Sequence, residues 1–363
     1  MIYRLLRPLL FRLDPERAHG IGMAAARLAA AASPVLRSSP DPALSQTLWN
    51  GLVFESPVGL APGFDKNGTR LKAWEALGFG FVEIGSATAR PSAGNPRPRA
   101  FRLPADRALI NRMGLNNDGA DVIAGRLESA SPKGRFPIGV NVAKTHDPAI
   151  LGDAALNDFA YSVERLMPVA DFVVLNISCP NTAEGKTFEE PTALDALLQR
   201  VATVRMSAGT TTPVLVKLAP PDAEGIDKPA VRELLAICRT HEINGFVISN
   251  TASDRGGLQS DAQTLEAIGN GGLSGQPLRE RALALTRFVY GETGGALPII
   301  GVGGIDSPEA AYERIRAGAS LLEIYTALVY EGPGLVRRIH RELPRLLERD
   351  GFSSLAAAVG SEA

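Results

Sequence analysis

Short apolar runs alternate with helical patterns along most of the chain. Each run is rich in β-branched residues and ends in Gly, Asn, Ser or Lys, and a segment of helical periodicity follows it. These patterns predict strands at 58–61, 81–85, 138–142, 172–177, 214–218, 245–249, 298–302 and 321–325. They predict helices near 68–77, 118–130, 153–167, 192–207, 225–241, 279–290 and 308–317. Eight strands alternating with helices indicate an α/β fold, a single (β/α)8 TIM barrel, with a doubly wound sheet as the alternative.

The spacing of the units suits one barrel, and we find no linker that would divide it. Ser307 before Pro308 predicts a helix start, because Ser caps helices and Pro is favoured in the first turn. We therefore expect a small N-terminal two-helix segment at 1–40, the barrel at 41–350 and a C-terminal tail at 351–363.

Polar residues gather where the predicted strands end, which in a β/α barrel is the side of the active site. The two longest connections, 86–137 and 249–297, are rich in Pro, Gly, Asn and Arg, and loops of this length are usually functional. Several Asn around one cavity suit a planar heterocycle with alternating C=O and N–H groups, and two Lys suit anions. The strand-end residues are Gly63, Lys66, Ser86, Asn141, Asn176, Lys217, Asn250, Gly303, Gly304, Tyr325 and Thr326.

The segment GVGGID at 301–306 ends the seventh predicted strand with glycines and opens a helix. In barrels, phosphate commonly binds after strands 7 and 8, at backbone N–H groups and a helix N-terminus. An ordinary glycine turn is the alternative. Together with the polar ring, the segment favours a flat phosphorylated cofactor, flavin mononucleotide (FMN).

Cys179 directly follows the fourth predicted strand. A thiol with a reference pKa of about 8.5 can serve as a general base when its neighbours lower that value. The alternative, a small buried apolar residue, is our interpretation of Cys238, which lies in a helical stretch. The position of Cys179 at a strand end favours the catalytic role.

The charge and the Cys and His content of the chain exclude several classes of function. A formal net charge of −1 argues against a nucleic-acid partner, and 2 Cys with 4 His exclude a disulfide framework and a zinc site, so no metal is expected.

Residues 1–40 carry six Arg and two acidic residues, a net charge of +4, and the apolar residues of the first turns recur at helical spacing. This pattern is typical of a helix in a membrane interface, or of a cap packed on the end of the domain. No uncharged run is long enough to span a bilayer.

Many motifs, in order, resemble those of dihydroorotate dehydrogenases over nearly the whole chain. They are LDPERAH (13–19), GLAPGFDKNG (59–68), EIGSATARP (83–91), PRAFRL (98–103), NRMGLNN (111–117), GVNVAK (139–144), NISCPNT (176–182), VLVKLAP (214–220), VISNT (247–251), GGLSGQPL (271–278), PIIGVGGIDS (298–307) and EIYTALVYEGP (323–333).

The resemblance implies oxidation of dihydroorotate to orotate in pyrimidine (UMP) biosynthesis, with a proton removed from C5 and a hydride passed from C6 to FMN. The implied flavin contacts are Ala61, Pro62, Gly63, Phe64, Asp65, Lys66, Ser86, Asn141, Asn176, Lys217, Ser249, Gly275, Gly304, Tyr325 and Thr326. The implied substrate contacts are Lys66, Asn111, Arg112, Met113, Gly114, Leu115, Asn176, Asn181, Asn250 and Thr251. In this comparison Lys217 faces the charge of the reduced flavin, and Lys66 takes the substrate carboxylate.

The N-terminal extension resembles that of the membrane-associated, quinone-dependent class (class 2). The resemblance implies helices at about 3–12 and 15–31 and an apolar tunnel for ubiquinone or menaquinone, lined by His19, Arg102 and Tyr325. It also implies a peripheral membrane protein, which we expect to be a monomer, on the cytoplasmic face of the inner (cell) membrane. The chain departs from this class at Cys179, where serine is usual. The alternatives are a soluble-type enzyme using fumarate or NAD, a flavin-free barrel isomerase or aldolase, and a catalytically silent membrane-anchored barrel.

Overall fold

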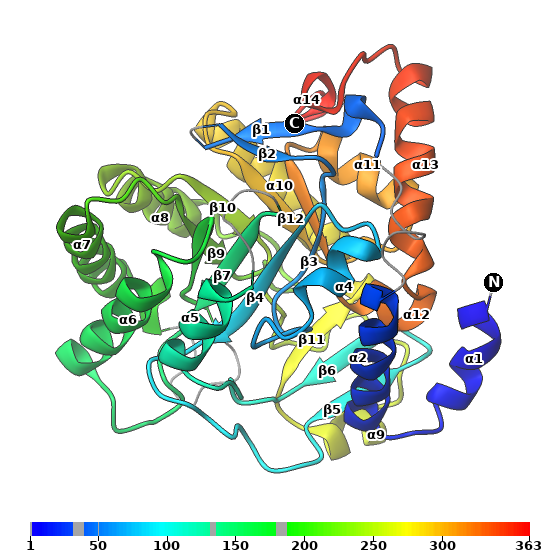
Figure 1. The fold of residues 1–363 in the computed structure, drawn as a ribbon, viewed down its shortest axis with the longest axis horizontal. Coiled ribbons are helices and arrows are strands. Elements are labelled where there is room, and N and C mark those ends of the chain that lie inside the picture. The colour runs from blue at the N-terminus through cyan, green and yellow to red at the C-terminus, as the bar shows by residue number, and fades with distance from the viewer. Residues whose placement is uncertain (1, 32–39, 50, 131–135, 179–186) are drawn as a thin grey trace.

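A closed parallel barrel forms the centre of the molecule (Figure 1). The computed structural model describes residues 2–31, 40–49, 51–130, 136–178 and 187–363. The barrel strands are β3 Val58–Leu60, β4 Phe81–Ala87, β7 Ile138–Val142, β8 Phe172–Asn176, β9 Val214–Leu218, β10 Gly245–Ile248, β12 Ile299–Val302 and β13 Leu321–Ile324. Their order around the barrel is β10-β12-β13-β3-β4-β7-β8-β9. The predicted barrel is confirmed, and the doubly wound sheet is excluded.

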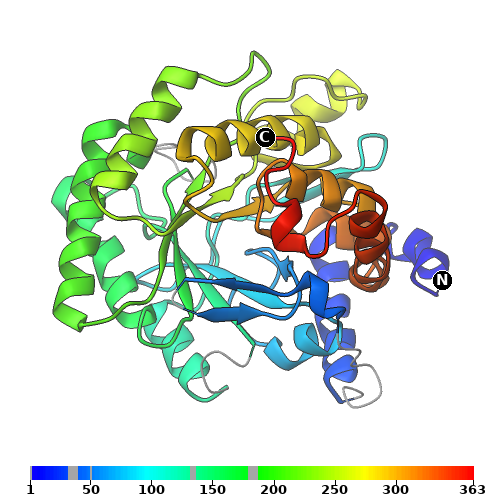
Figure 2. The ribbon, with the colours of Figure 1, turned by 90° about the horizontal axis from the view of Figure 1, so that it is seen from above.

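Helices connect successive barrel strands and surround them, as the view in Figure 2 shows. Ser307 caps α11 as predicted, because its Oγ accepts the N–H of Ala310 at 3.1 Å. The connecting helices are α4 Leu71–Ala76, α5 Ala120–Glu128, α6 Gly152–Leu166, α7 Pro191–Ala208, α8 Lys228–Thr240, α10 Arg279–Thr293 and α11 Pro308–Arg316. Each lies within a few residues of its predicted position.

Aromatic side chains fill the N-terminal half of the barrel interior. An antiparallel hairpin, β1 Gln46–Leu48 and β2 Leu52–Phe54, brings Phe54 against Phe81, with ring centroids 5.3 Å apart. Phe172 belongs to the same buried cluster and leaves no room for a side chain at Gly139, where a Cβ would lie 2.2 Å from its ring. This end of the barrel is therefore packed, and the space for a ligand lies at the other end.

The two long loops pair with each other over the C-terminal side of the barrel. β5 Ala100–Leu103 and β6 Ala108–Asn111 come from the first loop, and β11 Gly272–Gly275 comes from the second. They form an antiparallel sheet of order β11-β6-β5, in which Gly272 pairs with Asn111. The second loop also contains α9 Ala262–Ile268 and the 3₁₀ turn η3 Gln276–Leu278. This sheet holds the predicted substrate segment 111–115 beside the barrel mouth.

Both ends of the chain pack beside the last barrel units. The N-terminal helices are α1 Ile2–Leu10 and α2 Pro15–Ala31, and α1 lies next to α12 Thr326–Glu331 (Figure 1). The hydroxyl of Tyr3 donates to the carbonyl of Val329 at 2.5 Å. The remaining elements are η1 Pro42–Leu44, η2 Thr187–Glu189, α13 Gly334–Arg349 and α14 Leu355–Ala358. The segment expected as a tail carries α14 and docks on α11 through the N–H of Glu362, which donates to the carbonyl of Arg316 at 2.9 Å.

Candidate active site

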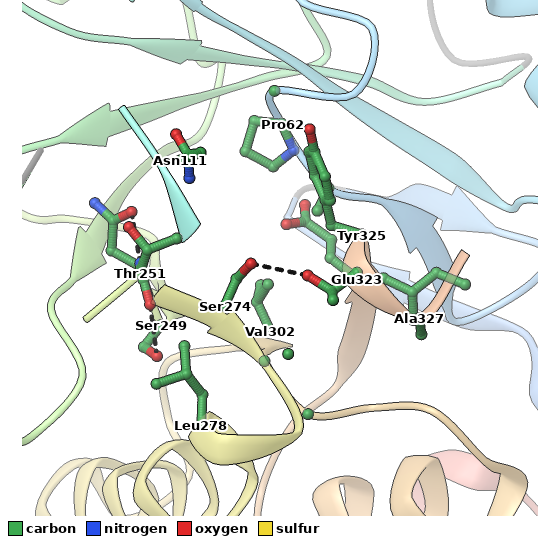
Figure 3. Close-up of a pocket in the computed structure, with 18 of the residues that line it drawn as sticks. Pro62, Asn111, Ser249, Thr251, Ser274, Leu278, Val302, Glu323, Tyr325 and Ala327 are labelled. Carbon is green, nitrogen blue, oxygen red and sulfur yellow. Dashed lines mark hydrogen bonds between the residues drawn. The ribbon is translucent and has the colours of Figure 1, made fainter. Parts of the chain in front are cut away.

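A cavity opens at the C-terminal ends of the barrel strands and extends beneath the small antiparallel sheet (Figure 3). Most residues predicted from the strand ends and from the family motifs meet in its wall. These are Ala61, Pro62, Gly63, Lys66, Ser86, Asn111, Met113, Leu115, Asn176, Lys217, Ser249, Asn250, Thr251, Gly275, Gly304, Tyr325 and Thr326. The wall also contains residues that the sequence did not single out, among them Arg107, Ser274, Asp306, Glu323 and Tyr330.

Two glycines allow backbone to pass close together at one end of the cavity. Gly304 has a φ of +70°, and a Cβ there would lie 2.5 Å from the Cα of Arg279. Gly275 has a φ of +106°, and a Cβ there would lie 2.5 Å from the carbonyl oxygen of Arg107. Close to them, the hydroxyls of Ser274 and Thr326 are 2.9 Å apart. This end therefore presents backbone and hydroxyl groups, which is the surface that suits a phosphate.

A buried arginine supports the same end from behind. Arg314 is 2% exposed, and its guanidinium donates to the carbonyls of Val302 at 3.1 Å, Gly303 at 2.9 Å and Arg279 at 3.2 Å. Burial lowers the pKa of Arg314 to about 9, so the group remains a cation at neutral pH. It fixes the path of the glycine turn after β12 and places a positive charge behind it.

A chain of hydrogen bonds runs through the polar ring, and every donor points the same way. Asn250 Nδ2 donates to Asn176 Oδ1 at 3.0 Å, and Asn176 Nδ2 donates to Ser86 Oγ at 3.1 Å. Ser86 Oγ donates to Asn141 Oδ1, and Asn141 Nδ2 donates to Glu83 Oε1 at 2.7 Å. The chain fixes the orientation of the carboxamides of Asn176 and Asn250 in the cavity wall.

Two carboxyl groups and one ammonium group are buried at the cavity, and two of the three, Glu323 and Lys217, are part of its wall. Glu83 on β4 and Glu323 on β13 have no exposed surface, and Lys217 on β9 is 5% exposed. Burial raises the pKa of Glu323 well above its ordinary value, and Glu83 beside it acts in the same direction, whereas Lys217 opposes the shift. The cluster therefore combines two acids with a single positive charge.

Lys66 lies in the cavity wall, where its ammonium group is suited to bind an anion. Its Nζ donates to the carbonyl of Gly63 at 2.8 Å. Burial, and next the charge of Arg99, lower the pKa of Lys66 to about 8, while Glu16 and Asp65 partly offset this. A bound carboxylate would relieve this repulsion, because an opposite charge favours the ionised amine.

Some predicted contacts lie outside the cavity wall and support it instead. Asp65 is buried and accepts hydrogen bonds from Trp74 Nε1 and from the N–H groups of Thr69 and Arg70, so it shapes the loop after β3. The other predicted flavin and substrate contacts outside the wall are Phe64, Arg112, Gly114 and Asn141. Cys179 and Asn181 lie outside the described residues.

The N-terminal helices meet the barrel mouth through aromatic contacts. The His19 ring lies edge-on to Phe64 at 4.9 Å, and Phe64 in turn lies edge-on to Tyr325 at 5.3 Å. Burial, and next the charge of Lys66, lower the pKa of His19 to about 4, so its ring is neutral at pH 7. Arg102 donates to the carbonyl of Leu13 at 2.8 Å. His19, Arg102 and Tyr325 thus lie between α2, the small sheet and the cavity, although only Tyr325 is in the cavity wall.

The N-terminal helices expose several large apolar side chains. The exposed fractions are 75% for Leu5, 59% for Leu9 and 74% for Leu28, and Leu6, Leu13 and Ile21 are also exposed. Large apolar side chains exposed together in one segment often mark an interaction site. None of the helices in the described part of the chain is long and apolar enough to cross a membrane.

Comparisons with known proteins agree with this geometry. The family model of dihydroorotate dehydrogenase matches residues 43–347. The dihydroorotate dehydrogenase (quinone) of Gloeobacter violaceus is 45% identical over 364 residues, covering 99% of this chain and 98% of that protein. The corresponding protein of Rhodospirillum rubrum is 46% identical over 363 residues, covering 99% and 94%.

Solved structures give the same result. The structure of DHODH from Eimeria tenella in complex with ferulenol superimposes with a TM-score of 0.84 at 32% identity, covering 97% of this chain and 98% of that one. A ligand-free structure of the same protein has a TM-score of 0.84 at 33% identity. The chain belongs to the dihydroorotate dehydrogenase family.

Proposed function

We propose that this protein oxidises dihydroorotate to orotate in pyrimidine biosynthesis, using FMN as cofactor and a membrane quinone as the final electron acceptor. The observation that carries this proposal is the cavity, where oriented carboxamides, two lysines and a glycine-lined anion site meet at the barrel mouth. The full-length similarity to quinone-dependent relatives supports the choice of acceptor over fumarate or NAD.

The residues of the cavity fit FMN on structural grounds. The bare backbone at Gly275 and Gly304 and the hydroxyls of Ser274 and Thr326 form a cradle in which a Cβ would collide with neighbouring backbone. Arg314 adds a buried positive charge behind the turn, which favours an anion such as phosphate there. When bound, the flavin supplies hydride acceptance and electron transfer to a second acceptor.

The chain's own residues bind and orient the substrate. Lys66 pairs with its carboxylate, and Asn176 and Asn250 present fixed donors and acceptors to the planar ring. Lys217, buried in the cavity wall, would stabilise negative charge on a reduced flavin, an electrostatic effect of a preorganised group. Cys179, although outside the described residues, follows β8 by three positions and is our candidate for the base that takes the C5 proton.

The N-terminal helices would carry the quinone function. The apolar side chains on α1 and α2 rest in the headgroup region of a membrane, and the Arg residues between them attract anionic lipid. His19, Phe64 and Tyr325 then form the route from that surface to the cavity. In this proposal residues 1–40 serve membrane contact, residues 41–350 serve the chemistry, and the protein is a monomer on the cytoplasmic face of the cell membrane.

Flavin identity and reduction by substrate test the proposal. Heat-released cofactor from the purified protein should be FMN, at one per chain, and anaerobic dihydroorotate should bleach the bound flavin. A protein that binds orotate without any flavin, or a flavoprotein that dihydroorotate leaves oxidised, would contradict it.

A further inference from the structure

We infer that Glu83 and Glu323 share a single proton at neutral pH and form, with Lys217, an electrically neutral floor beneath the proposed flavin site. This inference deepens the proposed function and rests on it only for the identity of the ring above the floor. In this assignment Glu323 is a positioning residue, which sets the charge of the surroundings of Lys217 without a hydrogen bond to it.

The composition of the barrel strands limits the charges involved. Among all residues of the eight barrel strands, the ionisable ones are Glu83, Lys217 and Glu323. β3 and β12, the two neighbours of β13, contribute none, and β7 contributes the uncharged Asn141. With every group ionised, the floor would carry a net charge of −1 in a fully buried place. A single retained proton makes the three groups neutral, which avoids an uncompensated buried charge.

Three buried carboxyl oxygens without a partner among the described residues point to the place of that proton. The donor chain from Asn250 ends on Glu83 Oε1, which accepts from Asn141. Glu83 Oε2 and both oxygens of Glu323 have no hydrogen-bond donor among the residues that the structure describes. The Glu83 carboxyl group lies close enough to raise the pKa of Glu323, and two carboxyl groups can form a hydrogen bond with each other only when one of them is protonated. A proton between Glu83 Oε2 and Glu323 satisfies both groups at once.

This arrangement has a consequence for the cavity. Glu323 lies in the cavity wall, so the charge of the floor acts directly on whatever lies above it (Figure 3). Release of the shared proton would make the floor anionic. It would then weaken retention of an anionic cofactor and oppose negative charge developing near Lys217. The proton belongs to the pair, so replacement of either acid should remove its titration.

The pH dependence of unfolding of the holoenzyme tests the pair without using activity. A carboxyl whose pKa is raised on folding stabilises the fold fully below its unfolded value, and that stability is lost as pH rises through the folded pKa. Above pH 4.5, the ordinary value for Glu, the native wild type should therefore bind one proton more than the unfolded chain. Its unfolding equilibrium constant should therefore rise tenfold more per pH unit than that of a protein without the shared proton, until the pair ionises.

Glu323→Gln should remove this extra slope, because its carboxamide N–H replaces the shared proton and donates to Glu83 Oε2. Glu83→Gln should do the same with the roles exchanged. The exposed acid Glu348 on α13 provides the control, and Glu348→Gln should keep the wild-type slope. The double variant Glu83→Gln/Glu323→Gln should be less stable at pH 7 than either single variant, because Lys217 loses its counter-charge. Parallel curves for wild type and Glu323→Gln would overturn the inference.

A second measurement on the wild type guards against variants that do not fold. The infrared spectrum at pH 7 should contain the C=O band of a protonated, buried carboxyl group, shifted in heavy water, and its absence would overturn the inference. Both readouts are independent of turnover. If the purified protein lacked FMN but showed the infrared band and the slope difference, the proposed function would fail and the shared proton would stand. If it contained FMN that dihydroorotate reduces but showed neither the band nor the slope difference, the shared proton would fail and the proposed function would stand.

Discussion

Gly304→Ala should release the cofactor without unfolding the barrel. The new Cβ meets two penalties at this position. The first penalty is the backbone conformation, because an L-residue at a φ of +70° costs about 1–2 kcal/mol. The second penalty is steric: the Cβ would lie 2.5 Å from the Cα and 2.7 Å from the N of Arg279, and moving the backbone to relieve such overpacking costs about 1–3 kcal/mol. The turn after β12 can relieve the second penalty only by changing the surface that we assign to phosphate.

Gly294→Ala is the matched control. Gly294 ends α10 at a φ of +60°. Apart from its chain neighbours, no atom of the described residues lies within 4 Å of the position that a Cβ would take, so this variant carries the first penalty alone. The difference between the two variants isolates the steric effect of about 1–3 kcal/mol, which corresponds to roughly a 5- to 150-fold weaker retention of FMN for Gly304→Ala.

Titration of the flavin-stripped variants with FMN, followed by flavin fluorescence, measures this difference, and chemical unfolding measures stability in parallel. We expect Gly304→Ala to bind FMN at least fivefold more weakly than Gly294→Ala. Equal FMN affinity of the two variants would show that the turn after β12 does not hold the phosphate, and would refute the assignment of this end of the cavity.

Three further predictions address the other parts of the site. The protonated amine of Lys66 binds the substrate carboxylate, and the pKa of this amine in the free protein is about 8, so kcat/KM for dihydroorotate should fall as pH rises through 8. Lys66→Met should bind dihydroorotate more weakly and should lose this fall in kcat/KM. Cys179→Ala should slow flavin reduction by about 10²–10⁴-fold with orotate binding retained, whereas an unchanged rate in a stopped-flow experiment would require another base. Leu5→Glu/Leu9→Glu should weaken sedimentation with anionic vesicles and leave reduction by dihydroorotate unchanged, and undiminished binding would remove α1 from the membrane contact.

The barrel could be predicted from the sequence because each strand is a local signal. The runs 138–142 and 214–218 are apolar except for Asn141 and Lys217, and their strands have the predicted limits. The sheet of β5, β6 and β11 could not be predicted in this way. It pairs segments from two loops about 160 residues apart in the chain, such as Asn111 with Gly272, and no local periodicity reports such a partner.

The residues of the site divide in the same way, into those that the sequence could predict and those that it could not. The Asn and Lys residues of the cavity were predictable because strand ends in a barrel share one face. Glu83 and Glu323 were overlooked although each interrupts an otherwise apolar strand, which is itself a signal of a functional group. Arg107 and Ser274 could not be placed, because they reach the cavity only through the pairing of the two long loops.

Reoxidation of the substrate-reduced enzyme tests the central claim most directly. The holoenzyme in lipid or detergent is first reduced with one equivalent of dihydroorotate without oxygen, and is then mixed rapidly with a soluble ubiquinone analogue, with fumarate or with NAD. We expect dihydroorotate to bleach the flavin and the quinone alone to restore its colour rapidly. Bleaching followed by reoxidation with fumarate or NAD, and not with quinone, would contradict the proposed acceptor, and a flavin that dihydroorotate fails to reduce would contradict the proposed reaction.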